Sequence, residues 1–458
     1  MDGVIVMKFG GSSVADAECI RAAAEIVRKR VDRRPVVVVS ALAGVTDLLE
    51  QALEAARRDD LEGLDPLLAD LERRHRWALA GCIDVARQRH HLGLEIDRLF
   101  EQLRQRLRSV RILGEETPRV RDAVLASGET LSARIVAAAF REWELPARWV
   151  DPEQVMATDE RFGEASPDAV RVRECCRASL LPVLDGGGVP VLGGFVGASS
   201  SGATTTLGRG GSDTTATVLG LALEAEEIQI WTDVDGLMSA DPRCVPAARR
   251  LARVSFAEAA ELAIYGARVL HADAIAPAVR RQIPVRVLNS RRPEGQGTLV
   301  VGDTPDGGRS GPVAIASKAG VSVVRVVSRR MPMDARLTVQ VLVSCREAEF
   351  VPQLVLSSAT TVTVVGVCPD RFSTLPGVAD TADVQITRDC AIVCVVGAAV
   401  DREPQMLARL LAELASWEPE LVTTGATRAS VVAVVRAAEL ADGVRRLHAR
   451  FLEGEVRE

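Results

Sequence analysis

Apolar and polar residues alternate in blocks over the first 300 residues or so. Five short runs are almost continuously Val, Ile or Leu, namely VIVM (4–7), PVVVVSA (35–41), VPVLGGFVG (189–197), IQIWTD (228–233) and PVRVLN (284–289). Such runs suit strands that are buried on both faces of a mostly parallel sheet. Helix-like stretches lie between them, so the pattern predicts an α/β sandwich in which helices cover both faces of a sheet.

Residues 47–111 have a different and strongly helical pattern. Apolar residues recur there at intervals of three and four and form one stripe along a helix; they are Leu92, Ile96, Leu99, Leu103, Leu107 and Val110. The stripe fits either a coiled-coil dimer or a helical hairpin that packs on its own domain. We favour the hairpin.

The segment VGDTPDGGRSGP (301–312) is rich in Gly, Pro and Asp and predicts a domain boundary. Beyond it the chain changes to short strand-rich units. The last unit begins with a strand (390–397) and a helix (404–416), and it ends with two strands (420–426 and 429–436) and a helix (437–453). This order predicts a small βαββα module.

A related unit precedes that module. Residues 320–328, 337–344 and 360–367 have the pattern of strands, and little between them favours a helix. We therefore predict a degenerate unit that lacks the helix between its first two strands.

Composition limits the kind of protein. A chain of 458 residues has room for roughly three domains, and its net charge of −6 is spread along the chain, so no basic face for nucleic acid or an anionic membrane stands out. The nine cysteines form no CxxC pair and the five histidines are scattered. With no signal peptide recognised, we expect a cytoplasmic protein with reduced thiols and no protein-bound metal site.

The stretch KFGGSSV (8–14) joins the first strand to a helix-like run. Two glycines there allow close approach of the backbone to a ligand and leave amide groups unpaired at a helix start. With the ammonium of Lys8, they make a candidate site for phosphate or another anion. A tight turn with a surface lysine is the alternative.

A second glycine-rich stretch, TTTLGRGGSD (204–213), contains a guanidinium, paired glycines and an acid at a helix start. Ser212 or Asp213 could serve only as a helix cap. Capping requires neither Arg209 nor the glycines, so we favour a second anion-binding turn that faces the first.

Three further clusters carry polar residues near strand ends or helix starts. WTDVDGLMSADPR (231–243) places several acids and an arginine after a strand, where ligands of open α/β sheets bind, although a simple surface loop explains it equally well. Glu129 of VLASGETLSARIV (124–136) is placed at a helix start, where it fits either a cap or a partner for an ammonium group. Ser40 and Thr46 lie in the turn after the strand at 35–41.

The ordered set of motifs resembles the aspartate kinases over nearly the whole chain. KFGGSSV, SALAGVT, SGE, TTLGRGGSD, WTDVDG…DPR and GARVLH (266–271) occur in the order and spacing of that family. The resemblance implies an amino-acid kinase αβα sandwich with a mostly parallel sheet over residues 1–304. It further implies tandem α+β ACT-like modules at 312–385 (the degenerate one) and 386–458.

The resemblance also implies an activity and a set of site residues. Aspartate kinases use ATP and Mg²⁺ to phosphorylate the side-chain carboxylate of L-aspartate, the first step toward lysine, threonine and methionine. The implied catalytic residues are Lys8, Asp213 and Arg209. The implied aspartate site comprises Ser40, Thr46, Glu129 and Arg209. The implied nucleotide site comprises Lys8, Gly10, Gly11, Ser12, Thr232, Asp233, Met238, Arg243 and Arg268.

Members of the family assemble through their ACT domains and bind end-product amino acids there, so we expect a homodimer or higher homo-oligomer and an amino-acid effector. Arg268 stands where the family usually has lysine. Two alternatives stay open: an amino-acid kinase with another carboxylate acceptor, such as glutamate or N-acetylglutamate, and a non-catalytic amino-acid-binding homologue.

Overall fold

The computed structural model describes residues 3–266, 272–302, 311–329, 335–369, 382–424 and 429–453, together with 372, 375, 377 and 378. The chain divides into two compact units. The first comprises Met1–Leu237, Ala252–Phe256 and Val269–Thr304; the second comprises Met238–Leu251, Ala257–Arg268 and Pro305–Glu458. Two short segments from within the predicted catalytic domain therefore group with the C-terminal part.

The first unit is built on an eight-stranded sheet of order β3-β4-β2-β1-β7-β9-β10-β8. Every neighbouring pair is parallel except β9 with β10, so the predicted mostly parallel sheet is confirmed. The strands are β1 (Ile5–Phe9), β2 (Pro35–Val39), β3 (Ala147–Trp149), β4 (Val189–Gly193), β7 (Glu227–Thr232), β8 (Arg253–Ser255), β9 (Val285–Asn289) and β10 (Thr298–Val301). A separate hairpin consists of β5 (Val196–Ala198) and β6 (Thr204–Thr206).

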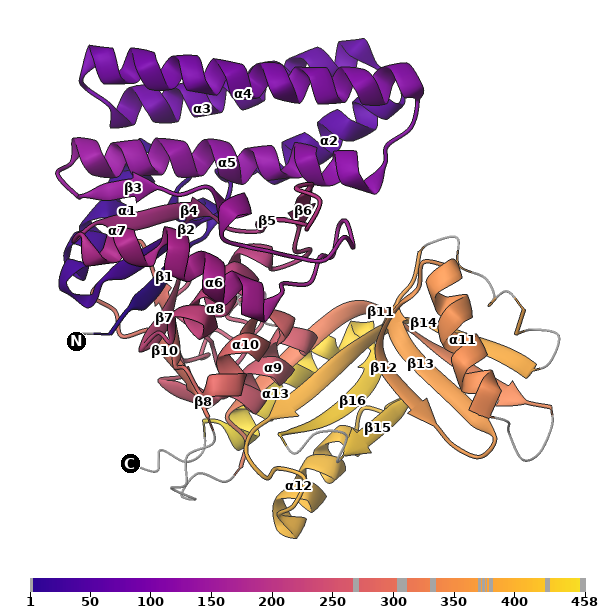
Figure 1. Ribbon diagram of the computed structural model, residues 1–458. Coiled ribbons are helices and arrows are strands. Elements are labelled where there is room, and N and C mark those ends of the chain that lie inside the picture. Colours follow the sequence, from indigo (N-terminus) through magenta and orange to yellow (C-terminus); the bar gives the residue numbers. More distant parts are fainter. Residues whose placement is uncertain are drawn as a thin grey trace. The chain divides into compact units, whose positions relative to one another are not determined.

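Two groups of helices pack with this sheet. α5 contacts β2, β3 and β4 and is surrounded by α1, α2, α3 and α4, whereas α8 contacts β1, β2 and β7 and packs with α6 and α10. Figure 1 shows α3 and α4 side by side beyond α5. The helices are α1 (Ala17–Arg28), α2 (Val45–Arg57), α3 (Leu61–Cys82), α4 (Ala86–Leu113), α5 (Pro118–Glu142), α6 (Ala169–Ser179), α7 (Leu181–Asp185), α8 (Gly211–Leu223) and α10 (Ala272–Arg281).

The apolar stripe predicted in residues 47–111 lies on α4 and is buried within its own unit. Leu92, Ile96, Leu103, Leu107 and Val110 all belong to one core cluster with residues of α2, α3 and α5. The hairpin interpretation is therefore confirmed, because the stripe is covered without a second chain.

Helix α5 is long and apolar enough to cross a membrane by length and composition alone. However, 83% of its most apolar window is buried inside the protein. That burial is typical of the core helix of a globular domain, and α5 is the main scaffold of the first unit.

The second unit contains a six-stranded antiparallel sheet of order β12-β13-β11-β14-β16-β15. Its elements are β11 (Ala314–Ser328), α11 (Ala335–Glu347), β12 (Val351–Ser357), β13 (Thr361–Val367), β14 (Ala382–Val396), α12 (Pro404–Ala415), β15 (Leu421–Thr424), β16 (Ser430–Arg436) and α13 (Leu440–Phe451), with most of α9 (Phe256–Tyr265). β11 and β14 pair along most of their length, with register shifts near Ala319 and Val321. The division predicted at residue 386 falls inside β14, which serves both halves of the sheet.

The prediction that the first ACT-like unit lacks its helix was wrong. Residues 337–344, interpreted as a strand, lie within α11, which stands between β11 and β12. Leu337, Val341 and Cys345 are buried at intervals of four, whereas Val339 and Val343 are 63% and 50% exposed. The apolar residues at every second position suggested a strand, but the buried ones among them recur at every fourth position, as on one face of a helix.

Candidate active site

The carboxyl ends of the parallel strands bring distant motifs together. Phe9 lies opposite Val39 and Trp231, and Val39 lies opposite Gly193. The residues that directly follow these strands therefore lie at one edge of the sheet, where ligands of open α/β sheets bind. They are Gly10 and Gly11, Ser40, Gly194, and Thr232 and Asp233.

The first glycine turn is held against β7. Gly10 N donates a hydrogen bond to Trp231 O at 3.0 Å. The chain then forms a short 3₁₀ turn (Gly11–Ser13) before α1, and α1 is capped by Asp16. The α1 amide groups are therefore partly satisfied, and the anion-binding capacity of this turn rests on its backbone and on Lys8.

Lys8 forms an ion pair with Asp213 at the start of α8. Lys8 Nζ lies 2.5 Å from Asp213 Oδ1, and the two side chains are 12% and 9% exposed. A Cβ added to Gly10 would lie 3.8 Å from Lys8 Nζ, so the ammonium group sits beside the glycine turn. The structure thus joins the first and second glycine-rich motifs through this pair.

Neither Ser212 nor Asp213 is the N-cap of helix α8, so the alternative that they serve only as a helix cap does not hold. Its N-cap is Gly210, which has φ 69° and no side chain to accept a hydrogen bond, and Asp213 lies in the first turn. Asp213 instead contacts Lys8. The uncapped amide groups at the start of α8 and the helix dipole favour a negatively charged ligand at this point.

Arg209 lies in the turn before α8, between two glycines in the left-handed region. Gly208 and Gly210 have φ of 73° and 69°, a backbone conformation that residues other than glycine seldom adopt. Arg209 is exposed, and no carboxylate contacts its guanidinium within the part of the chain that the structure describes. Since Asp213 is four residues away, the Cα of Arg209 lies within about 14 Å of the residue that contacts Lys8.

Glu129 was predicted at a helix start, but it lies in the interior of α5. Its side chain is buried, and its Oε2 atom has no hydrogen-bond partner among the described residues. Burial raises the pKa of Glu129 to about 7, against the opposing effects of a backbone hydrogen bond from Ala41 and of the Lys8 charge. A buried carboxylate with an unpartnered oxygen is a ready acceptor for a ligand ammonium group.

Two adjacent glycines at the end of β4 place Glu129 and α8 near each other. A Cβ added to Gly193 would lie 3.0 Å from Glu129 Cβ, and one added to Gly194 would lie 2.7 Å from Ser212 Cβ. Helix α5 at Glu129 and the α8 N-terminus therefore approach the sheet at consecutive residues. This juxtaposition makes the carboxyl edge of β4 the centre of the candidate site.

Ser40 and Thr46 lie at the same edge. Ser40 follows β2, and its backbone oxygen accepts a hydrogen bond from Ser132 Oγ at 2.7 Å. Thr46 is the second residue of α2 and is half-buried. Ser40 therefore lies in the turn between β2 and α2, as predicted, whereas Thr46 lies in the first turn of α2, and α2 packs against α5.

The predicted nucleotide residues are divided between the two units. Thr232 and Asp233 end β7, where Thr232 Oγ1 donates to Asp233 Oδ1 at 3.2 Å. Met238 and Arg243 belong to the second unit, and Arg243 is paired there with Asp241 at 2.6 Å. Arg268 lies outside the described residues.

Sequence reasoning gave no role to some residues that shape this edge. Ser290, which follows β9, shares a hydrogen bond of 2.8 Å with Ser13 and donates to Thr232 O at 3.0 Å. Asp235, counted among the candidate acids, accepts from Asn289 at 2.7 Å and pairs with Arg292 at 2.9 Å. The position of Ser290 directly after a parallel strand was the signal available for it.

Comparisons with known proteins show the family of this chain. The model of the amino acid kinase family matches residues 3–289. The chain is 40% identical over 312 residues to lysine-sensitive aspartokinase 3 of Escherichia coli K12, covering 66% of this chain and 65% of that protein. It is 30% identical over 475 residues to chloroplastic aspartokinase 2 of Arabidopsis thaliana, covering 98% of this chain and 84% of that protein.

A solved structure gives the same result over the full length. The crystal structure of E. coli aspartokinase III in complex with aspartate and ADP matches with a TM-score of 0.84 and 31% sequence identity. The match covers 97% of this chain and 99% of that chain. The chain therefore belongs to the amino acid kinase family and, within it, to the aspartokinases.

Proposed function

We propose that this chain transfers the γ-phosphoryl group of ATP to the side-chain carboxylate of L-aspartate and forms 4-phospho-L-aspartate. One observation carries the proposal: the Lys8–Asp213 pair and the buried Glu129 carboxylate lie at one edge of the sheet. The likeness to an aspartokinase crystallised with aspartate and ADP supports the choice of substrates.

The nucleophile determines what the site must do. A side-chain carboxylate with a pKa near 3.9 is already ionised at neutral pH, so the reaction needs no general base. Two anions must instead be held together, and catalysis consists of positioning and charge neutralisation. In this scheme Lys8 neutralises the transferred phosphoryl group, and Asp213 orients Lys8 through the 2.5 Å ion pair.

The acceptor is held by the remaining residues of the edge. Glu129 receives the α-ammonium group of aspartate, which supplies donors to its unpartnered oxygen. Arg209 binds a substrate carboxylate, for which its planar guanidinium offers two parallel hydrogen bonds. Ser40 and Thr46 line the same pocket.

The nucleotide contacts begin at the glycine turn of Gly10, Gly11 and Ser12. Thr232 and Asp233, at the end of β7, adjoin this turn through the hydrogen bond from Gly10 N to Trp231 O. Met238, Arg243 and Arg268 stay candidate nucleotide contacts on the family resemblance alone.

Mg²⁺ enters the proposal as a companion of ATP. All nine cysteines are free, and no group of three or more His, Cys, Asp or Glu suited to a metal occurs in the described parts of the chain. This donor set fits an ion that is held mainly by nucleotide phosphates and water. When bound, Mg²⁺ supplies positive charge to the β- and γ-phosphates.

Trapping of the acyl phosphate tests the function. Purified protein with Mg-ATP and L-aspartate should yield a hydroxamate when hydroxylamine is present. L-Glutamate and N-acetylglutamate are the comparison acceptors. Higher turnover with either one would replace aspartate as the substrate, and amino-acid binding by calorimetry without any ATP turnover would indicate a non-catalytic homologue.

The ionisation of Glu129 predicts a pH profile. Only the ionised carboxylate attracts an ammonium group, and the pKa of Glu129 is about 7 in the free protein. With Mg-ATP saturating, kcat/KM for aspartate should fall by about tenfold for each pH unit below about 7. The measurement is initial rates from pH 5.5 to 8.5. A profile that stays flat down to pH 6 would contradict a role for ionised Glu129.

The second unit suggests regulation. We propose that it binds an amino-acid effector and joins copies of the chain into a homodimer, in the cytoplasm. The complete first module with α11 supports effector binding, and a relative carries the name lysine-sensitive aspartokinase. Initial rates with and without lysine, threonine or methionine, together with light scattering, test both points.

A further inference from the structure

Asp122 is a fully buried carboxylate in the second turn of α5. Its Oδ2 accepts hydrogen bonds from Thr206 N at 2.8 Å and from Gly163 N at 2.9 Å, and its Oδ1 accepts from Thr206 Oγ1 at 2.8 Å. Burial of a charge is unfavourable unless hydrogen bonds satisfy it. Three donors do so here, two from Thr206 at the end of β6 and one from the loop of Gly163.

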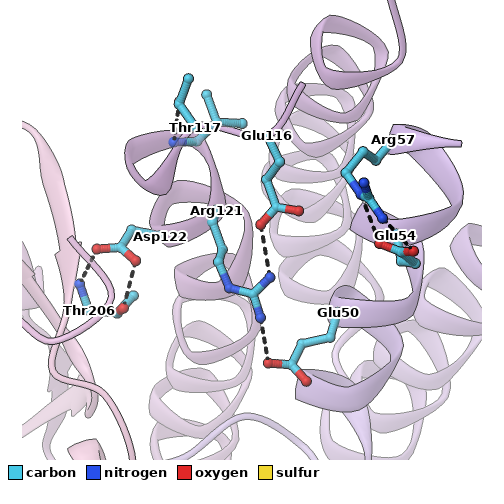
Figure 2. A network of polar contacts seen from close by, with 9 residues as sticks. Glu50, Glu54, Arg57, Glu116, Thr117, Arg121, Asp122 and Thr206 are labelled. Atoms are coloured by element: carbon cyan, nitrogen blue, oxygen red, sulfur yellow. Dashed lines mark hydrogen bonds and ion pairs between the residues drawn. The ribbon is translucent and has the colours of Figure 1, made fainter. Parts of the chain in front are cut away.

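No cation neutralises this carboxylate among the described residues. Figure 2 shows Asp122 directed toward Thr206, while the neighbouring Arg121 is directed toward Glu116 and Glu50. Arg121 lies 2.8 Å from Glu116 and 3.0 Å from Glu50. Asp122 therefore holds the end of β6 and the loop of Gly163 through hydrogen bonds. The ion pairs of Arg121 form a separate network.

The segment that Asp122 holds leads directly to Arg209. Thr206 is the last residue of β6, and Arg209 follows three residues later. The loop is fixed further because Ala165 N donates to Thr206 O at 2.9 Å and Leu207 N donates to Phe195 O at 2.9 Å. Asp122 thus anchors the base of the turn that carries the guanidinium.

The same helix carries the proposed ammonium acceptor. Asp122 and Glu129 are seven residues apart on α5, which is nearly two helical turns and about 10 Å along the axis. They lie on the same side of the helix, since seven residues is close to a whole number of turns. One rigid helix therefore sets both Glu129 and the anchor of the Arg209 turn.

We propose that Asp122 is a positioning residue that fixes Arg209 relative to Glu129 and thereby sets the geometry of the acceptor site. The inference rests on the proposed function, because it assigns Arg209 to a substrate carboxylate. Asp122 contacts no substrate itself. Asp122 bonds to Gly163 and Thr206 and not to Lys8, Asp213 or Gly10, so we expect its replacement to affect the acceptor side more than the phosphate side.

Kinetics of Asp122→Asn test this inference. Asparagine has an NH₂ group in place of one carboxylate oxygen. That group is a donor and cannot accept the hydrogen bonds that Gly163 and Thr206 donate, so the Arg209 turn loses its fixed position. KM for aspartate should rise by about tenfold while KM for ATP stays within about twofold of wild type. Arg121→Gln is the matched control on the same helix turn, and it should leave both KM values unchanged.

A double-mutant cycle separates positioning from general stability. If Asp122 acts through Arg209, Asp122→Asn should raise KM for aspartate much less in an Arg209→Ala background than in wild type. Additive effects, or a KM for ATP that rises as much as the KM for aspartate, would overturn the proposal. Should Asp122→Asn fail to fold, Thr206→Val removes one of the three hydrogen bonds and should raise KM for aspartate by about threefold.

The two hypotheses fail differently in these assays. Wild-type protein that forms no acyl phosphate from aspartate would refute the proposed function. Wild-type turnover together with an unchanged KM for aspartate in Asp122→Asn would refute the positioning role alone.

Discussion

Replacement of Lys8 by methionine should lower kcat for aspartate phosphorylation by about 100- to 1,000-fold. Methionine keeps most of the length of the side chain and removes the ammonium charge. In the native protein that charge lies 2.5 Å from Asp213 and beside the Gly10 turn, in a site that is largely shielded from water. Charge stabilisation in such a site is stronger than in water, so its loss should slow the chemical step.

The hydroxamate assay measures this loss, and Lys29→Met is the control. Lys29 forms an ion pair with Glu294 at 2.5 Å, but both side chains are mostly exposed, so the pair contributes little. Lys29→Met should behave as wild type. A Lys8→Met protein that is folded and retains more than about a third of wild-type kcat would show that Lys8 has no part in phosphoryl transfer.

Replacement of Glu129 by glutamine should raise KM for aspartate by about 100-fold and leave KM for ATP nearly unchanged. Glutamine has the same shape but offers no negative charge to the α-ammonium group of aspartate. A buried ammonium group without an opposite charge is unfavourable, so aspartate should bind more weakly. The variant should also lose the predicted fall of kcat/KM below about pH 7, because the titrating group is gone.

The pH dependence of folding stability tests the burial of Glu129 independently of catalysis. Burial raises the pKa of Glu129 from its ordinary value of 4.5 to about 7, so the folded protein binds more protons than the unfolded chain between these values. The contribution of Glu129 to folding therefore worsens as pH rises from about 4.5 to about 7. Glu129→Gln removes this penalty and should melt at a higher temperature than wild type at pH 8.

The control for both measurements is Glu142→Gln on the same helix. Glu142 is the last residue of α5, and one oxygen accepts hydrogen bonds from the amide groups of Asp84 and Val85 at 3.0 and 3.1 Å. Glutamine can accept the same bonds. Equal effects of Glu129→Gln and Glu142→Gln on KM for aspartate would contradict the ammonium site.

The sequence predicted five strands of the first sheet because they are almost wholly buried, but it missed β3, β8 and β10, which are short and partly exposed. Continuous runs such as residues 35–39 have no other explanation in an alternating α/β pattern, and the parallel order then brings Gly10, Ser40 and Thr232 to one edge. Glu129 was placed at a helix start, although it lies in the interior of α5. In fact Gly128 is required inside α5, where a Cβ would lie 2.9 Å from Ala41 Cβ.

The second unit was harder to predict for physical reasons. In α11, apolar residues occur on the solvent-exposed face as well as on the buried face, so periodicity did not distinguish helix from strand. The grouping of residues 238–251 with the C-terminal unit follows from long-range packing, in which Ala240 and Val245 join the core of α12 and α13. Asp122 escaped notice because its partners lie 41 and 84 residues away in sequence.

A crystal structure with aspartate and a non-hydrolysable ATP analogue bound tests the central claim most directly. We expect Lys8 Nζ at about 3 Å from the terminal phosphate and the Arg209 guanidinium on a carboxylate of the aspartate beside it. Lys8 and Arg209 directed into separate cavities, with the two ligands out of reach of each other, would contradict it.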